Sequence, residues 1–131
     1  MKRTFALLVS LLFVVCAAFA QEAYDIEEEK PVDTTIEIIV PKTTHSDVRT
    51  ASVKIEYIRM VDEVRIYYTC MDVQFDQGDA MNTILACLKD FQAENQYFSY
   101  NFLAKDRTRF YTDSKTKMKM AQYSSYVKFH R

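Results

Sequence analysis

The sequence predicts an α+β fold, in which a single small domain packs one amphipathic helix on a mostly antiparallel sheet in the order β-β-β-α-β-β. Residues 53–58 and 64–75 alternate polar and apolar side chains with the period of two that is typical of strands. Residues 79–94 instead repeat apolar side chains with the helical period. The chain has 131 residues, 49% of them hydrophobic, which is enough for one domain with its own core.

Three predicted strands precede the helix. Residues 36–40 form a short β-branched run that ends at Pro41, which predicts the first strand, and residues 53–58 predict the second. In the third, residues 64–75, alternation places one set of side chains on a common face: Val64, Ile66, Tyr68 and Cys70. Both faces become apolar toward the end of this segment, which predicts a central strand with packing on each side.

The helix is predicted over residues 79–94 and is expected to end at Asn95. Its apolar face is predicted to consist of Met81, Ile84, Leu85, Leu88 and Phe91. Asp76 and Asp79 suit the N-cap and the first turn, where carboxylates accept free backbone N–H groups and favour the helix dipole. Together with Asp72 they also suggest a calcium site, but their spacing does not match an EF-hand loop, so capping is favoured.

Alternation returns after the helix. Residues 97–102 carry aromatic side chains on both faces of a predicted strand, and residues 109–120 predict a hairpin. Residues 122–129 fit a strand or a helix equally well, because their apolar positions follow neither period.

The N-terminus predicts export. Residues 1–20 have the two cations, the apolar run and the final small-x-small pattern of a secretory signal peptide. The apolar stretch of residues 5–20 is shorter than the roughly 20 residues that a membrane span needs. A lipoprotein anchored at Cys16 is less favoured, because Val15 stands where a small residue is required. We therefore expect an exported protein, either periplasmic or secreted, without a transmembrane span in its mature chain.

Acidic and basic residues are concentrated in different parts of the mature chain. Residues 21–34 include three consecutive glutamates and little to bury, which predicts an acidic flexible arm before the α+β domain of residues 35–131. Residues 21–63 carry 5 basic and 11 acidic side chains, whereas residues 95–131 carry 8 basic and 2 acidic ones. A cation-rich surface is therefore expected from the last third of the sequence.

A single glycine, Gly78, excludes several site types. The dinucleotide fingerprint, the phosphate-binding loop and the nucleophile elbow each need at least two glycines. With two histidines and three cysteines, one of them in the leader, a zinc cluster is short of ligands. We therefore predict no catalytic residue, no cofactor and no metal, and a protein that is not an enzyme. A small hydrolase without a recognisable motif, its site assembled from distant residues, is one alternative.

Two cysteines follow the leader, Cys70 and Cys87. In an oxidising compartment such a pair is first interpreted as a disulfide. On the predicted helix, however, Cys87 lies at the border of the apolar face, and Cys70 lies far back along its strand. The disulfide is the leading interpretation, and two buried thiols are the alternative.

Tyrosines and lysines supply the candidate binding surface, because a tyrosine has an apolar body with a polar tip and cations beside rings attract anions. The candidates are Tyr57, Tyr67, Tyr97, Lys115, Lys117, Lys119, Tyr123 and Tyr126. We expect a binding module that contacts an envelope or extracellular protein or an anionic surface, with nucleic acid disfavoured by the leader. The alternative is a soluble carrier of a small apolar or aromatic ligand between helix and sheet.

Overall fold

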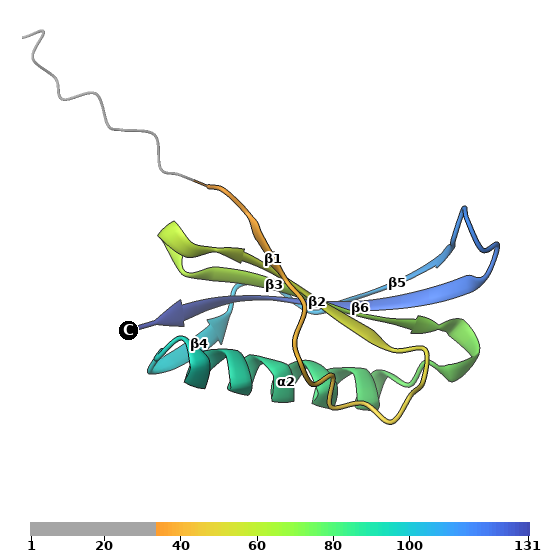
Figure 1. The fold of residues 1–131 in the computed structure, drawn as a ribbon, viewed down its shortest axis with the longest axis horizontal. Coiled ribbons are helices and arrows are strands. Elements are labelled where there is room, and N and C mark those ends of the chain that lie inside the picture. Colours follow the sequence, from red (N-terminus) through yellow and green to blue (C-terminus); the bar gives the residue numbers. More distant parts are fainter. Residues whose placement is uncertain (1–33) are drawn as a thin grey trace, which may run out of the picture. The chain divides into compact units, whose positions relative to one another are not determined.

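The structure is a computed structural model that describes residues 34–131. The predicted signal peptide, residues 1–20, and all but the last residue of the predicted acidic arm lie outside the described residues. The described chain forms an antiparallel sheet of six strands with one α-helix, which confirms the predicted fold class and element order (Figure 1).

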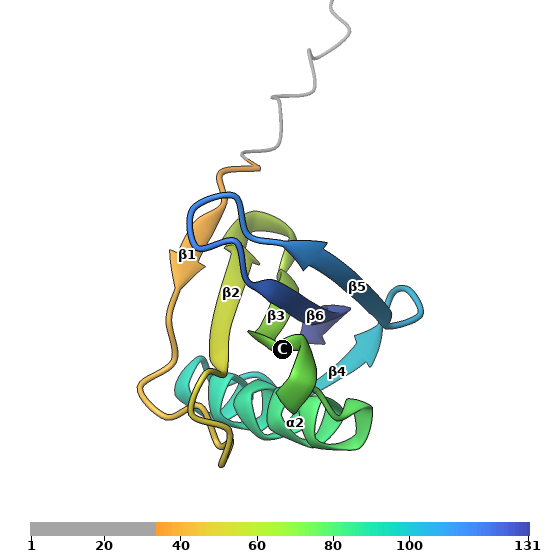
Figure 2. The same ribbon diagram turned by 90° about the vertical axis from the view of Figure 1, so that its right-hand side faces the viewer.

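The sheet has the order β1-β2-β3-β6-β4, with β5 also paired to β6. Its strands are β1 (Glu37–Ile39), β2 (Ser52–Ile58), β3 (Glu63–Met71), β4 (Ser99–Phe102), β5 (Arg107–Thr112) and β6 (Lys119–His130). The long strand β6 pairs with β3 along one edge. Along its other edge it pairs first with β5 and then with β4, so three strands meet on it (Figure 2).

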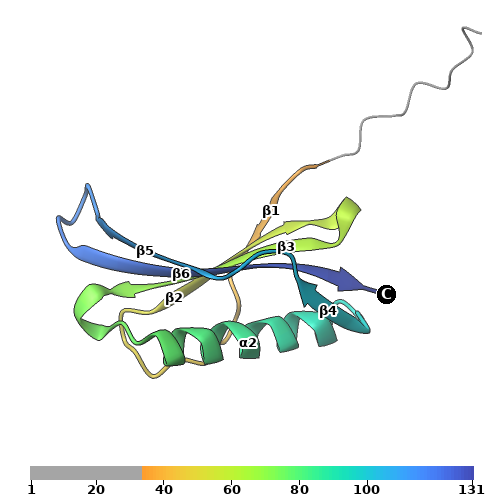
Figure 3. The same cartoon turned by 180° about the vertical axis from the view of Figure 1, so that it is seen from behind.

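The helix α2 (Gln77–Glu94) lies along one face of this sheet, as the views from either side show (Figures 1 and 3). The side chain of Asp76 accepts a hydrogen bond from the amide of Gly78, and Asp79 lies in the first turn. Asn95 is the C-cap, and its side chain donates to the carbonyl of Phe91 at 2.9 Å. Both caps are therefore residues that the sequence indicated, although the helix begins at Gln77, two residues before the predicted start.

The predicted inward face of the third strand is confirmed. Val64, Ile66, Tyr68 and Cys70 are fully buried beneath the helix. β3 is central, between β2 and β6, but the helix covers only one of its faces. The strand also ends earlier than predicted, at Met71, because the chain turns into the short 3-10 helix η2 (Asp72–Gln74), where Val73 is 85% exposed.

The buried face of the helix is rotated from the predicted one. The buried side chains of α2 are Ala80, Thr83, Ile84, Cys87, Leu88 and Phe91. Met81, which was predicted to be buried, is 43% exposed, and Cys87 lies inside the face rather than at its border. The helix turns its small residues Ala80 and Thr83 toward the sheet, and this leaves the larger Met81 at the rim.

Residues 122–129, for which the sequence favours neither strand nor helix, are part of strand β6, whose alternate residues are buried. Phe129 joins an aromatic cluster under the helix, in which its ring lies 5.2 Å from that of Phe91 and 4.9 Å from that of Tyr97. Tyr57 meets Phe91 edge to face at 5.0 Å. Contacts of this kind add to the free energy of burying the rings, by about 0.5–1.5 kcal/mol for each pair.

Candidate anion-binding face

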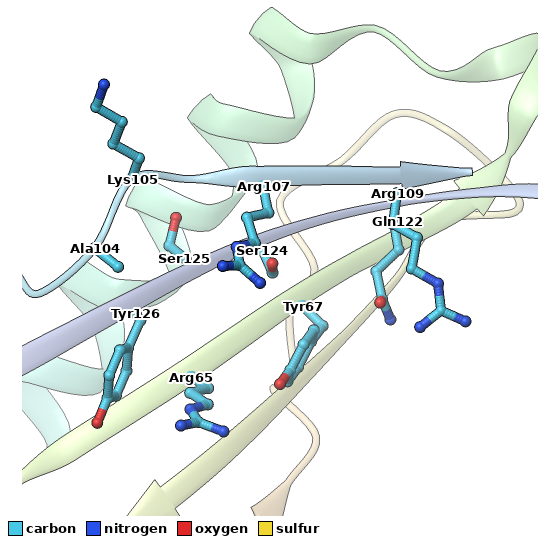
Figure 4. Close-up of a pocket in the computed structure, with 10 residues that line it drawn as sticks. All are labelled: Arg65, Tyr67, Ala104, Lys105, Arg107, Arg109, Gln122, Ser124, Ser125 and Tyr126. Carbon is cyan, nitrogen blue, oxygen red and sulfur yellow. The ribbon is translucent and has the colours of Figure 1, made fainter. Parts of the chain in front are cut away.

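The sheet face that points away from α2, called the outer face here, contains a hollow of about 400 Å³. Strand alternation directs every second side chain of β3, β5 and β6 to this face. The hollow is lined by cationic, aromatic and small polar residues (Figure 4): Arg65, Tyr67, Ala104, Lys105, Arg107, Arg109, Gln122, Ser124, Ser125 and Tyr126.

Strand register brings three arginines from distant parts of the chain to this hollow. Arg65 on β3 lies opposite Tyr126 on β6. On the other edge of β6, Arg107 lies opposite Ser124 and Arg109 lies opposite Gln122. Because directly paired residues point to the same face, all three guanidinium groups share the outer face with these β6 side chains.

None of the three arginines is neutralised by a carboxylate of the described chain. The ion pairs found within residues 34–131 are Lys54–Glu56, Arg59–Glu37 and Arg131–Asp62, and His45 makes a close contact with Asp90. None of these pairs includes an arginine of the hollow. The lining of the hollow contains four cationic side chains and no carboxylate, and this excess of positive charge lowers the free energy of an anion placed there.

Aromatic rings hold two of these guanidinium groups in place. The guanidinium of Arg65 lies 4.7 Å from the ring centre of Tyr126, and that of Arg109 lies 5.0 Å from the ring centre of Tyr111. Such cation–π contacts orient the cation and contribute about 0.5–1 kcal/mol at exposed sites. They leave the N–H donors at the edge of the guanidinium plane able to bind a ligand.

The acidic side chains of the outer face are occupied by neighbouring hydroxyl and ammonium groups. Glu63 accepts a hydrogen bond from the hydroxyl of Tyr126, and this bond is the main cause of the raised pKa of Tyr126. Glu56 lies 3.3 Å from the ammonium of Lys54 and accepts from the hydroxyl of Tyr67 at 3.4 Å. Glu56 also lies directly opposite Arg65 in the β2–β3 register, but neither carboxylate is within ion-pair distance of the Arg65 guanidinium.

Two of the predicted binding tyrosines, Tyr67 and Tyr126, line the hollow. The prediction was wrong for Tyr57, Tyr97 and Tyr123, which are buried at 1%, 5% and 3% exposure. Strand alternation places Tyr57 and Tyr123 on the helix side of the sheet, and Tyr97 reaches the same side from the segment between α2 and β4. Their rings fill the core. They belong to the packing of the domain and not to an accessible surface.

The hydroxyl groups of the buried tyrosines all have partners. Tyr57 and Tyr97 share a hydrogen bond, and Tyr97 also donates to Asp62 at 2.6 Å. Tyr123 donates to Asp106, which also accepts from Ser125 at 2.7 Å. Burial, followed by the hydrogen bond to Asp106, raises the pKa of Tyr123 to about 12.

The predicted lysines lie elsewhere. Lys115 and Lys117 are in the exposed turn between β5 and β6, and Lys119 begins β6. The side chain of Asp113 organises this turn, accepting from the Lys115 amide at 3.1 Å and from Thr116 at 2.9 Å. None of the three lysines lines the hollow.

Sequence reasoning missed the arginines and Lys105. The spacing of Arg107 and Arg109 two residues apart, in the most basic third of the sequence, was the available signal for a cationic strand face. Their approach to Arg65 required the pairing of β5 and β3 with the two edges of β6.

The predicted disulfide is not formed, because Cys70 and Cys87 are free thiols in the structure. Cys70 lies near the end of β3, and its thiol faces the carbonyl of Met71. Cys87 lies ten residues into α2 and faces the carbonyl groups of Thr43 and Thr44 in the loop before β2. The two thiols thus pack against different segments, and both are buried.

A second, apolar groove runs beside the helix. It has a volume of about 510 Å³ between α2 and the chain that connects β4 to β5. Its apolar lining comes mainly from Met81, Leu85, Phe102 and Leu103. Within residues 34–131, no group of three or more His, Cys, Asp or Glu side chains is placed to hold a metal ion.

In the described part of the chain, no helix combines the length and the apolar character that crossing a membrane requires. Comparison of the sequence and the structure with protein-family models, curated proteins and solved structures finds no match.

Proposed function

We propose that this protein is an exported, non-enzymatic binding module that holds an anionic partner on the outer face of its sheet. The observation that carries the proposal is the group of three arginines, Arg65, Arg107 and Arg109, none of which is paired with a carboxylate of the described chain. A guanidinium group offers paired N–H donors that match a carboxylate or phosphate, and Arg is favoured wherever such groups are recognised.

Binding is favoured over catalysis by the chemistry of the lining. Besides its cations, the hollow presents the amide of Gln122, the hydroxyl of Ser124 and the rings of Tyr67 and Tyr126. These groups donate hydrogen bonds and provide flat contact area. The predicted leader directs the module to the periplasm or the exterior, where acidic protein segments and anionic surfaces are available partners.

The test compares two triple variants with the same change in charge. One replaces Arg65, Arg107 and Arg109 with Gln, and the matched control replaces Lys115, Lys117 and Lys119 with Gln. Binding is measured to poly-glutamate and to vesicles of phosphatidylglycerol and phosphatidylcholine at two salt concentrations. We expect the arginine variant to bind poly-glutamate roughly tenfold more weakly or worse, since hydrogen bonds to charged groups contribute about 1.5–3 kcal/mol each.

The lysine variant should bind poly-glutamate nearly as well as the unmodified protein. Equal weakening by both variants would mean that net charge, and not this face, attracts anions, and it would contradict the proposal. Absence of binding to both probes would contradict it as well. Binding to vesicles alone would identify the partner as a lipid surface rather than an acidic protein segment.

A second candidate function is the carriage of a small apolar ligand, which the groove beside Met81, Leu85 and Leu103 favours. Native mass spectrometry of the purified protein would detect a retained ligand of this class. Leu103→Asp should then release it, whereas the arginine variant should retain it.

A further inference from the structure

Strand β5 forms a free edge of the sheet. It pairs with β6 on one side, and within residues 34–131 no strand pairs with its other side. At six residues it is long enough to receive another strand, and five of those six residues are exposed. An exposed edge of this kind is a template for pairing with a second chain.

The direction of the free backbone groups follows from the turn that joins β5 to β6. The amide of Asp113 donates to the carbonyl of Met118 at 2.9 Å, so this pair is of the hydrogen-bonded type. Hydrogen-bonded and non-bonded pairs alternate in an antiparallel ladder. The backbones of Arg107, Arg109 and Tyr111 therefore face β6. Those of Thr108, Phe110 and Thr112 face outward.

The two sides of this edge differ in chemistry. Arg107 and Arg109 lie on the outer face, next to the hollow. Phe110 points to the helix side, where it is 61% exposed and meets the ring of Phe75 edge to face at 5.8 Å. A strand laid along β5 would thus have cations beside one set of its side chains and an aromatic surface beside the other set.

We infer that the edge of β5 binds, by antiparallel strand addition, an extended segment of a partner protein in which acidic and apolar residues alternate. The inference rests on the proposed function and names its ligand class. The acidic side chains reach Arg107 and Arg109, and the apolar ones cover Phe110. The partner's backbone exchanges hydrogen bonds with Thr108, Phe110 and Thr112.

The opposite edge of the sheet lacks this combination. Strand β1 has only three residues, and its one charged side chain, Glu37, is paired with Arg59 at 3.1 Å. Its exposed apolar residues have no free cation among them. Charge complementarity therefore selects β5 for an acidic segment.

The experiment measures the affinity of a synthetic peptide of about seven residues that alternates Glu and Val. The first control has the same composition with its glutamates and valines in separate blocks. In two further peptides the backbone amides are methylated, either those of the valines or those of the glutamates. When the peptide pairs antiparallel with β5, its residues opposite Thr108 and Phe110 place their side chains on the same face of the sheet as Phe110. These residues are the valines, so the valine amides point toward the backbone of β5.

We expect methylation of the valine amides to weaken binding roughly tenfold or more, because each methyl group removes a backbone hydrogen bond to β5. Methylation of the glutamate amides should change it little. In the protein, Thr108→Pro removes one outward N–H and keeps the ladder to β6, as prolines in edge strands do. Thr108→Val, which keeps the N–H, is its matched control.

The outcomes separate this inference from the proposed function. Thr108→Pro should weaken the alternating peptide and leave poly-glutamate binding unchanged. If the blocked and alternating peptides bind equally, or if both methylated peptides bind like the parent, strand addition is wrong while anion binding by the arginines stands. The methylated peptides decide the matter even where Thr108→Pro fails to fold.

Discussion

The hydroxyl of Tyr97 donates a hydrogen bond of 2.6 Å to Oδ1 of Asp62, and this bond connects the segment after α2 to the turn between β2 and β3. Asp62 also adopts the left-handed conformation, with a φ of 54°, and its carbonyl accepts the amide of Phe129 at 2.8 Å. One residue thus joins the β2–β3 turn, the segment after the helix and strand β6.

Substitution of Asp62 should show its role as a hydrogen-bond acceptor and its role as a residue in the left-handed conformation. Asp62→Asn keeps a side-chain acceptor and tolerates the left-handed conformation, so we expect a small loss of stability. Asp62→Ala loses the acceptor for a buried hydroxyl and adds strain at positive φ, for a combined cost of about 2–4 kcal/mol. Asp62→Gly should fall between them, because it loses the acceptor and the ion pair with Arg131 but adds no strain at positive φ. Urea unfolding of the three variants checks this order, and equal losses in Ala and Gly would exclude a contribution from backbone strain.

Stability should fall at alkaline pH because of the buried tyrosines. Burial raises the pKa of Tyr123 to about 12 in the folded state, above the ordinary value of about 10 in the unfolded chain. The folded state therefore binds this proton more tightly, and the stabilisation is complete below about pH 10 and lost as the pH rises toward 12. Burial raises the pKa of Tyr97 in the same direction.

The measurement is the free energy of unfolding from pH 9 to 12. Tyr123→Phe should be less stable at neutral pH, by about 1 kcal/mol for the lost bond to Asp106, and should lose less stability with rising pH. The two curves should therefore converge. Parallel curves would show that Tyr123 does not titrate differently in the two states.

The N-cap of α2 provides a test of the capping interpretation against calcium binding. Asp76→Ala should cost about 1 kcal/mol, and Asp76→Ser should cost less because Ser also caps helices. Asp72→Ala is the control, since Asp72 lies in η2 outside the cap. Calcium or a chelator should leave the melting temperature of the unmodified protein unchanged. A calcium-dependent increase that Asp76→Ala abolishes would instead support a metal site.

Both cysteines should react slowly with a thiol reagent in the folded protein. Burial, with a smaller effect of Asp90, raises the pKa of Cys87 to about 11, and burial also raises the pKa of Cys70. Little reactive thiolate is therefore present at pH 8. Two thiols should be labelled rapidly in urea and very slowly without it. A mass 2 Da lower before reduction would show that a disulfide forms after all.

Expression of the chain with its predicted leader tests the export proposal. The mature protein should begin at Gln21 and appear in the soluble exported fraction, and intact mass measures both cleavage and thiol state. A heavier species that begins at Cys16 and partitions into detergent would replace this proposal with a lipoprotein.

Features that depend on local sequence were predicted well. The buried set of β3 and the caps Asp76 and Asn95 follow from alternation and from orphan backbone groups, which act within a few residues. The rotation of α2 was not predictable in this way. Apolar side chains of this helix extend beyond its buried face, and the contact with the sheet decides that Ala80 is buried and Met81 is not.

Strand β6 and the candidate face could not be predicted without knowledge of the tertiary contacts. The buried residues of β6 include both Ala121 and Ser125 among larger ones, so their hydropathy does not alternate even though their burial does. Pairing with β3 and β5 decides the conformation. The same pairing brings Arg65 beside two arginines about forty positions later, and no pattern within the sequence encodes that approach.

The position of β6 has a consequence for the order in which the protein folds. Its residues are synthesised after those of all five other strands, yet β3, β4 and β5 all pair with it. A nascent chain can form the β2–β3 hairpin, but β4 and β5 have no neighbour until residues 119–130 have emerged. Contacts between such distant segments also form slowly. A chain exported during synthesis would therefore cross the membrane before its sheet closed, and the domain would assemble at its destination.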